Sequence, residues 1–501
     1  MRKTVLLLAL VVLAVLFASG AALLSLEVGE VSAQAGPKPN IIFVLTDDQF
    51  PGSENEMTAL KSNVIDQGVK FTNMTSTFPL CCPGRATIQR GQYAHNTQIY
   101  GNSPPAGGWE KFQARGLHRS TVATWLNPPR DQAPNYQTGL FGKYMNNYRD
   151  KVIPPGWDRW YAWNGVDEGW TSVNDQGNQK PLDRQEADYF VAREALEFLD
   201  TRLDNVAPVF AFVNFGAMHE PYHHARVDDD KFQGENVPRT PSFNEEDVSD
   251  KPGYVSRLPR LSASEVSQLD QDYRNALRSL MRVDRFVGDA FELLRRKGEL
   301  DNTYFVFYTD NGAHFGQHRF GHGKLQPYEE DVNFPLYVRG PGIPRGVAKP
   351  ELVGNHDIAP TLADMAGADV PNFVDGRSFL PLATGMAASW PRTAILSERE
   401  VDAEPPNRWD MLRMRGKVYT RHQNGDKEYY DLAPGVDPYQ VHNALGAADT
   451  TYARPDDATL AYYEDRLDDL YRCGWDTTDP GTSMTCRQAE NAPLLPAGAT
   501  P

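Results

Sequence analysis

Two adjacent cysteines, Cys81 and Cys82, stand in the segment CCPGRATIQRG, and the whole chain contains only four cysteines. A zinc site would need pairs of cysteines in CxxC spacing, which this sequence does not have. A disulfide between neighbouring residues would need a strained backbone. Two interpretations remain on these residues alone: a pair of buried thiols in a core turn, or a cysteine that does not stay a cysteine.

Polar residues that can bind ions follow several apolar runs. NIIFVLT precedes two aspartates, YQTGLFG precedes a lysine, PVFAFVNFGAM precedes a histidine, and NTYFVFYT precedes an aspartate and an asparagine. One such residue alone would indicate a helix cap or a turn. Several at the carboxyl edge of one sheet indicate a ligand site. The residues are Asp47, Asp48, Lys143, His219, Asp310 and Asn311.

Two kinds of charge would meet at this edge. The side chains of Asp47, Asp48, Asp310 and Asn311 offer oxygen atoms, which suit a hard cation such as Ca²⁺ or Mg²⁺. Positive charge would come from Lys143, His219, Arg85 and Lys324. A cation beside such a group is typical of a site for a tetrahedral oxyanion.

The elements that must position these residues follow from periodicity. The apolar runs are continuous, which is typical of parallel strands buried on both faces. Residues 267–298 repeat apolar side chains at helical spacing and end at Gly298, and residues 356–367 predict another helix. Strands alternating with helices predict an α/β sheet. The segment AASWPRTAILSERE marks the passage to a smaller C-terminal domain, and the tail APLLPAGATP is expected to be disordered.

The N-terminus has the pattern of an export signal. MRK precedes a long apolar stretch, and SAQAG offers a cleavage site after Ala35, so residues 1–35 are expected to be a signal peptide. A retained membrane anchor is the alternative. Export to the extracellular space, the periplasm or the cell surface favours disulfides, so Cys473 and Cys486 could close one. The net charge of −16 disfavours nucleic acid as a partner.

The segment CCPGR fits the pattern C-x-P-x-R, and the chain resembles the type I, formylglycine-dependent sulfatases. The resemblance covers roughly Pro39 to Leu445 and is greatest to the N-acetylglucosamine-6-sulfatase and arylsulfatase branch. It implies an alkaline-phosphatase-like α/β fold: a mixed, mainly parallel sheet flanked by helices in a catalytic domain of residues 36–390, and a smaller α+β subdomain of residues 391–501. The matching segments include GKYMNNY, IPPGWDRW, TDNGAHFGQH, GKLQPYEEDVNFPLYVRGPGI, DIAPTLADMAG, DGRSFLPL and YYDLAPGVDPYQVHNAL.

The resemblance also implies roles for individual residues. A formylglycine-generating enzyme would oxidise Cys81 to Cα-formylglycine, whose hydrated form would attack the sulfur of a sulfate ester. The metal, Ca²⁺ rather than Mg²⁺, would be held by residue 81 together with Asp47, Asp48, Asp310 and Asn311. Lys143 and Lys324 would bind the sulfate oxygens, and Arg85 would hold the formylglycine hydroxyl. His219 would bind substrate and protonate the leaving alcohol.

The chain departs from many arylsulfatases at a few positions. Met145 stands where those enzymes carry an active-site histidine that helps position the aldehyde hydrate. Asn146 is expected to do part of that work and to bind substrate. His314 and His318 are expected to line the substrate pocket. Gly84 replaces the common serine of the cysteine motif.

The expected function is hydrolysis of a sulfate ester, carried by a sulfated sugar such as a glycosaminoglycan or by an aryl sulfate. One alternative is a phosphomonoester or phosphonate ester hydrolase on the same fold. Another is a non-catalytic carbohydrate-binding relative, against which the complete set of metal ligands and cations argues. Turnover of paired aryl sulfate and phosphate esters separates the first two.

Overall fold

The computed structural model describes residues 37–129, 132–164, 172–400, 408–446, 453–474, 482 and 484–495. The expected signal peptide of residues 1–35 lies outside these ranges, as do residues 496–501 of the expected disordered tail. Among the described residues, no helix is both long and apolar enough to cross a membrane.

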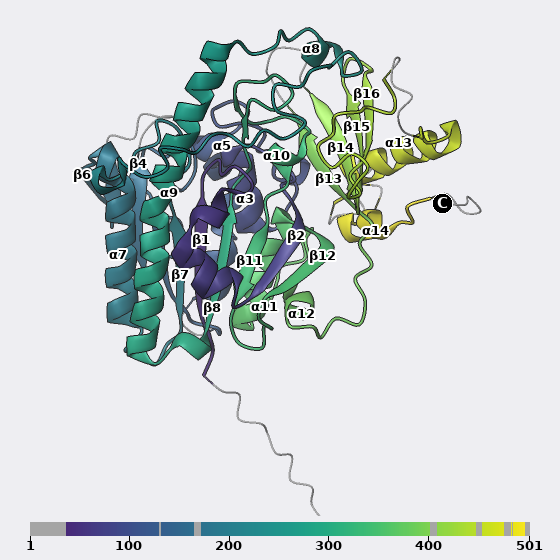
Figure 1. The fold of residues 1–501 in the computed structure, drawn as a ribbon. Helices are drawn as coiled ribbons and strands as arrows, with labels where there is room; N and C mark the ends of the chain where they lie inside the picture. The colour runs from purple at the N-terminus through teal and green to yellow at the C-terminus, as the bar shows by residue number, and fades with distance from the viewer. Residues whose placement is uncertain are drawn as a thin grey trace, which may run out of the picture. The chain divides into compact units, whose positions relative to one another are not determined.

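A ten-stranded sheet forms the centre of the fold (Figure 1). Its strands lie in the order β12–β2–β11–β8–β1–β7–β3–β4–β5–β6. The run from β8 to β4 is parallel throughout, and β12 is parallel to β2, whereas β11, β5 and β6 are antiparallel to their neighbours. This confirms the mixed, mainly parallel sheet. The strands are β1 Asn40–Thr46, β2 Val69–Thr75, β3 Gln137–Gly142, β4 Arg159–Asn164, β5 Ser172–Asp175, β6 Asn178–Pro181, β7 Val209–Asn214, β8 Thr303–Thr309, β11 Leu336–Arg339 and β12 Val347–Gly354.

The central strands are continuous apolar runs because both of their faces are covered. Every residue of β1, β7 and β8 is buried. The structure corrects one predicted boundary: β7 ends at Asn214, five residues before His219. The N–H of Phe215 still donates to the carbonyl oxygen of Leu45 on β1, but the N–H groups that follow find other acceptors. Those of Gly216 and Ala217 bond the side chain of Asp188 instead of a neighbouring strand.

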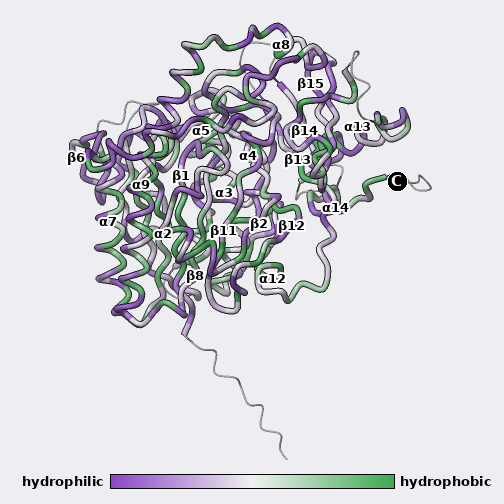
Figure 2. The backbone as a smooth tube through the Cα atoms, viewed as in Figure 1, coloured by the Kyte–Doolittle hydropathy of each residue, from purple (hydrophilic) through white to green (hydrophobic). Residues whose placement is uncertain are grey.

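Long helices flank the sheet. In Figure 1, α7 (Ala187–Arg202) and α9 (Ala263–Lys297) run side by side, and Figure 2 shows hydrophilic and hydrophobic segments alternating along α7, as expected for a helix with one apolar face. Helix α9 begins at a capping box of Ser262 and Glu265 and ends at Gly298, where φ is 73°. This confirms the predicted helix and its stop. A second group, α3 (Cys81–Arg90), α6 (Val122–Leu126) and α11 (Ile358–Ala366), packs together, with α11 against β1.

A separate antiparallel sheet follows toward the C-terminus. Its strands are β13 Ala394–Arg399, β14 Trp409–Met414, β15 Lys417–His422 and β16 Lys427–Asp431, in that order. Helix α13 (Asp457–Tyr471) packs on β13 and β14, and α14 (Cys486–Asn491) packs on α13. A disulfide joins Cys473, just beyond α13, to Cys486 at the start of α14. The predicted pairing of these two cysteines is confirmed.

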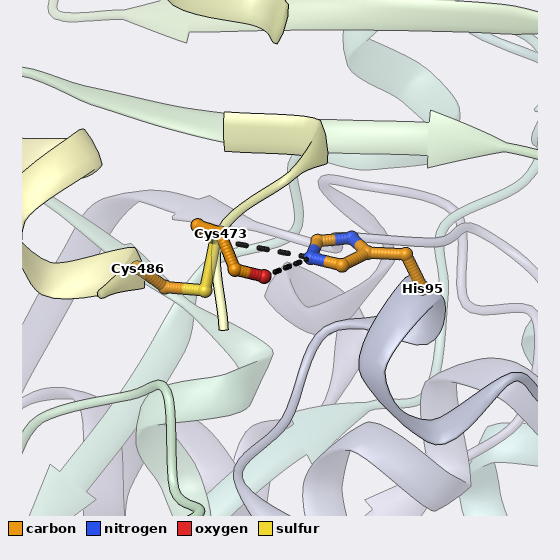
Figure 3. Close-up of side chains that lie close together, drawn as sticks. All are labelled: His95, Cys473 and Cys486. Carbon is orange, nitrogen blue, oxygen red and sulfur yellow. Dashed lines mark hydrogen bonds between the residues drawn. A yellow bond between two sulfur atoms is a disulfide. The ribbon is translucent and has the colours of Figure 1, made fainter. Parts of the chain in front are cut away.

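The disulfide lies beside His95 of the short helix α4 (Ala94–Thr97), as Figure 3 shows. His95 Nε2 is 3.2 Å from the carbonyl oxygen of Cys473, and Nδ1 is 2.9 Å from Glu398 Oε1. Both partners are acceptors, so both ring nitrogens carry hydrogen and the ring is an imidazolium. Burial opposes this charge, but the Glu398 carboxylate outweighs it and raises the pKa of His95. A charged histidine thus links the disulfide loop to the N-terminal half of the chain.

Candidate active site

Cys81 is the first residue of α3, and all ten residues of this helix are buried. Leu80 before it is extended, and Asn102 Oδ1 accepts the backbone N–H of Cys82 at 3.0 Å. Gly84 lets the helix approach the end of β8, because a Cβ atom there would lie 2.8 Å from the carbonyl oxygen of Asp310. The close approach of α3 to the backbone just beyond β8 therefore favours glycine at position 84.

Two lysines bring positive charge to Cys81. Lys324 Nζ lies 2.9 Å from Cys81 Sγ, and it also bonds both carboxylate oxygens of Asp48, at 2.5 and 2.7 Å. Lys324 directly follows the small hairpin of β9 (His314–Phe315) and β10 (His322–Gly323). Lys143, which directly follows β3, bonds Asp47. Asp47 Oδ1 is in turn 3.5 Å from Cys81 Sγ.

Arg85 lies one helical turn beyond Cys81 and is 2 % exposed. Its Nε donates to Asp310 Oδ2 at 2.8 Å, and its Nη1 donates to the carbonyl oxygen of Lys143 at 2.8 Å and to Asn214 Oδ1 at 3.3 Å. Its Nη2 is 3.7 Å from Asp47 Oδ2. The guanidinium thus joins the ends of β1, β3, β7 and β8. Asn214 was not predicted from sequence, although its place as the polar residue that ends β7 could have suggested it.

The four predicted oxygen ligands do come together. Asp47 and Asp48 directly follow β1, and Asp310 and Asn311 directly follow β8, its parallel neighbour in the sheet. Asn311 Nδ2 donates to Asp48 Oδ1 at 2.6 Å, and the backbone N–H of Asp48 lies 3.4 Å from Asp310 Oδ1. Asp48 has φ of 54°, a left-handed conformation that non-glycine residues adopt rarely and mostly at functional sites.

This cluster fits a hard divalent cation. Its donors are oxygen atoms on residues that are at most 5 % exposed. Asn311 Oδ1 is buried and has no hydrogen-bond partner, so it is an acceptor left for a cation. Ligand atoms of Asp47, Asp48, Cys81 and His219 also lie within 4.8 Å of one another.

Burial and charge set the protonation of the site. Burial opposes ionisation of Asp47, but Lys143, His219 and Arg85 outweigh it and hold the pKa of Asp47 well below its usual value. Burial and the Asp47 charge raise the pKa of Asp310 to about 6. Burial, with Asp47, also raises the pKa of Cys81 to about 12. The thiol of the encoded cysteine would therefore stay protonated at neutral pH and would be a poor nucleophile.

His219 reaches the site from the loop after β7. Its Nε2 is 3.7 Å from Asp48 Oδ2, and its Nδ1 is 2.7 Å from the carbonyl oxygen of Glu220. Because that carbonyl can only accept, Nδ1 carries hydrogen, and Nε2 is the nitrogen that can gain and lose a proton. The ring is thus held with its titrating nitrogen toward the acidic cluster.

Three further residues were predicted to bind substrate, and their neighbours are as follows. Asn146 follows Met145, whose Sδ accepts from Gln89 Nε2 at 3.5 Å. His314 Nδ1 is 2.8 Å from Asp331 Oδ1. His318, which is 1 % exposed, has Nδ1 2.7 Å from Glu245 Oε2. The roles of Asn146, His314 and His318 in binding substrate stay predictions.

Family models match most of the chain. The model described as Sulfatase matches residues 39–368, and the model described as N-sulphoglucosamine sulphohydrolase, C-terminal, matches residues 301–451. The human N-acetylglucosamine-6-sulfatase is 31 % identical over 380 residues, which are 72 % of this chain and 67 % of that protein. The extracellular sulfatase SULF-1 homolog of Drosophila melanogaster is 34 % identical over 355 residues, which are 69 % of this chain and 31 % of that protein.

Some relatives are much longer than the matched region. The chain spans about a third of the Drosophila protein and about half of a Sulf-1 homolog from Caenorhabditis elegans, at 31 % and 49 % of their lengths.

Solved structures share the fold at lower identity. One, of a protein in complex with its substrate D-glucosamine-2-N,6-O-disulfate, has a TM-score of 0.70 at 21 % identity and covers 89 % of this chain and 100 % of that one.

A second solved structure, a phosphonate monoester hydrolase from Silicibacter pomeroyi, has a TM-score of 0.63 at 19 % identity and covers 86 % of this chain and 95 % of that one. At these identities both structures support the fold alone. The family itself is shown by the model match over residues 39–368 and by the 31 % identity to the human N-acetylglucosamine-6-sulfatase over 67 % of its length. Together with the CCPGR motif at the start of α3, they identify the chain as a member of the sulfatase family.

Proposed function

We propose that this chain is a sulfuric ester hydrolase whose reaction takes place at residue 81. The observation that carries the proposal is the arrangement around Cys81, where Lys324 and Lys143 meet the acidic ends of β1 and β8 at the buried start of α3. A sulfate ester carries negative charge that repels a nucleophile. Fixed cations beside residue 81 reduce that repulsion.

Two groups beyond the encoded side chains belong to the proposal. Hydrated Cα-formylglycine at position 81 would supply one hydroxyl to attack sulfur and a second to release sulfate afterwards. Its formation requires a formylglycine-generating enzyme. A divalent metal, with Ca²⁺ preferred over Mg²⁺, would be held by Asp47, Asp48, Asp310 and Asn311 with residue 81, and would lower the pKa of the attacking hydroxyl.

The chain's own residues would then act as follows. Lys143 and Lys324 would bind sulfate oxygens, since their ammonium groups are held beside residue 81 by the aspartates. Arg85 would hold the nucleophile through the same guanidinium that bonds Asp310. His219 would give the proton on Nε2 to the leaving alcohol. Asn146, His314 and His318 would bind the remainder of the substrate.

The substrate class we propose is a sulfated sugar. It is supported by relatives named N-acetylglucosamine-6-sulfatase and by the structural neighbour solved with a glucosamine disulfate. Export of the protein is supported by the Cys473–Cys486 disulfide and by relatives named as extracellular sulfatases. A catalytic domain of residues 36–390 and a C-terminal subdomain of residues 391–501 remain our proposal for the domain division.

A phosphonate or phosphate ester hydrolase is the second candidate, supported by the phosphonate monoester hydrolase among the structural neighbours. The test compares aryl sulfate, aryl phosphate and aryl phosphonate esters with the same aryl leaving group, using protein co-expressed with a formylglycine-generating enzyme. A 6-O-sulfated glucosamine is assayed in parallel. We expect the highest kcat/KM among the aryl esters for the sulfate, and release of sulfate from the sugar. A higher kcat/KM for phosphonate or phosphate would contradict the proposal.

A further inference from the structure

The loop of residues 215–219 carries His219 from the end of β7 to the site, and its backbone bonds can be followed one by one. The N–H of Phe215 donates to the carbonyl oxygen of Leu45 at 2.8 Å. The N–H of Met218 donates to the carbonyl oxygen of Asp47 at 2.7 Å, and the N–H of Asp47 donates back to the carbonyl oxygen of Ala217 at 2.8 Å. The loop is therefore fastened directly to the backbone of a proposed metal ligand.

Within the loop, the N–H of His219 donates to the carbonyl oxygen of Gly216 at 2.8 Å, whereas the N–H groups of Gly216 and Ala217 go to one side chain on another element. Asp188 accepts the N–H of Gly216 on Oδ1 at 2.8 Å and the N–H of Ala217 on Oδ2 at 3.1 Å. Asp188 is the second residue of α7, where the helix N-terminus favours a carboxylate. It is 8 % exposed, so these bonds are shielded from water. Asp188, Gly216, Ala217 and His219 line the same small cavity.

We propose that Asp188 is a positioning residue that sets His219 against the leaving group of the substrate. Ala217 is the link, because its N–H donates to Asp188 and its carbonyl oxygen accepts the N–H of Asp47. A carboxylate that holds two successive N–H groups fixes the direction in which the loop leaves β7. His219 follows two residues later, with Nε2 3.7 Å from Asp48 Oδ2. The inference rests on the proposed function, since it needs His219 to serve as the acid.

The substitution Asp188→Asn removes one of the two bonds with little change in volume. An asparagine side chain has one oxygen to accept an N–H, and its amide group would face the other N–H as a second donor. Loss of that bond loosens the loop that places His219, while the bonds between Asp47 and the loop backbone stay. The variant therefore tests the position of the acid and leaves the proposed metal ligands intact.

Asp284 of α9 offers a matched control. It accepts the N–H of Leu60 on Oδ1 at 2.8 Å and the N–H of Ala59 on Oδ2 at 3.1 Å, together with the hydroxyl of Thr58 on Oδ2 at 3.2 Å, and it is 7 % exposed. Its partners belong to the short helix α2 (Thr58–Leu60) and not to the loop of His219. Asp284→Asn thus makes the same chemical change at a site of equal burial, and it should cost similar stability without moving the acid.

The experiment measures turnover of two sulfate esters, one with an activated aryl leaving group and one with a poor alkyl or sugar leaving group, for the wild type and both variants. In Asp188→Asn we expect turnover of the poor leaving group to fall about 10- to 100-fold, while the activated ester changes by less than about threefold. Metal content should stay unchanged. Asp284→Asn should show no such difference between the two esters.

Amide hydrogen exchange of the peptide that contains residues 215–219 gives a readout that needs no activity. Exchange should be faster in Asp188→Asn than in the wild type, and unchanged in Asp284→Asn. Three outcomes would each overturn the role of Asp188. Turnover of both esters could fall equally in Asp188→Asn, or Asp284→Asn could show the same difference between the two esters. Amide exchange of residues 215–219 could also be unchanged in Asp188→Asn. A wild type without turnover of any sulfate ester would instead refute the proposed function, and the exchange comparison would still decide whether Asp188 holds the loop.

Discussion

Lys324 Nζ lies 2.9 Å from Cys81 Sγ, closer to that sulfur than Asp47 Oδ1, which lies at 3.5 Å. Lys324 reaches this place because both oxygens of the Asp48 carboxylate hold its ammonium group. A single cation therefore contacts the proposed nucleophile and a proposed metal ligand. This arrangement ties the chemistry at residue 81 to the acidic ends of β1 and β8.

The adjacent cysteines allow a direct test of the residue that reacts. Cys81→Ala should lower turnover on the order of 10³-fold or more, since it removes the nucleophile. Cys82→Ala is the matched control, because Cys82 is equally buried in α3 but its sulfur accepts hydrogen bonds from the backbone of Gly108 and Asn146, whereas Lys324 contacts the sulfur of Cys81. Mass spectrometry of the peptide with residue 81 should show an aldehyde in active protein. An unmodified thiol in fully active protein would contradict the proposed mechanism.

The unpaired oxygen of Asn311 leads to a prediction about metal. Asn311→Leu keeps a similar volume but removes the oxygen, so metal content measured by elemental analysis should fall and turnover should fall with it. Ca²⁺ should also raise the melting temperature of the wild type more than that of the variant, because a ligand that binds only the folded state stabilises it.

Asn355 supplies the control for the metal test. It is a fully buried asparagine whose Oδ1 accepts from the backbone N–H and hydroxyl of Thr77, so Asn355→Leu should lower stability yet keep the metal. Full turnover of the wild type after exhaustive chelation would count against a required metal.

The sequence predicted much of this site because parallel neighbours end at the same edge. Thr46 lies opposite Thr309 in the sheet, so the aspartates after β1 and the Asp–Asn pair after β8 had to meet. The periodicity of apolar residues predicts where these strands lie and where they end. It says nothing about Lys324 or Arg85, which lie outside the strands: the sequence offered them as positive charges for the site, and the family resemblance supplied their individual roles. The predicted end of β7 was wrong because the Asp188 side chain on α7, which is distant in sequence, accepts the backbone N–H groups of Gly216 and Ala217. A longer strand would have used those donors in the sheet.

His95 leads to a prediction about stability and pH. Its pKa in the folded protein is raised by Glu398 against the opposing effect of burial, so the folded state binds the proton more tightly than the unfolded state does. The stabilisation from His95 is therefore complete below the ordinary histidine pKa of about 6.5 and is lost as pH rises through the folded pKa. His95→Gln should lower the free energy of unfolding most at about pH 5.5 to 6. The difference from the wild type should shrink as the pH is raised to about 9.

Denaturant titrations at several pH values measure that deficit. His224→Gln is the control, because His224 pairs at 3.2 Å with Asp229, whose side chain is 60 % exposed. Its effect on the free energy of unfolding should be small at every pH. A deficit in His95→Gln that grows with pH would show that His95 is neutral in the folded protein.

The geometry of His219 makes a prediction about leaving groups. Since the Glu220 carbonyl oxygen fixes hydrogen on Nδ1, only Nε2 can deliver a proton to the substrate. A poor leaving group such as a sugar alcohol needs that proton, whereas an activated aryl oxide departs without it. A histidine that only bound sulfate would matter equally for both kinds of ester.

His219→Ala should therefore slow hydrolysis of the poor leaving group by about 10²-fold or more, and that of the activated aryl sulfate far less. The alkaline limb of the pH–rate profile for the poor leaving group should change, because a general acid stops working when it loses its proton, while metal content should stay as in the wild type. His224→Ala, a substitution in the following loop, should leave both rates unaltered. Equal losses on both esters with metal intact would assign His219 to sulfate binding, because binding energy lost with the ring would not depend on how readily the alcohol departs.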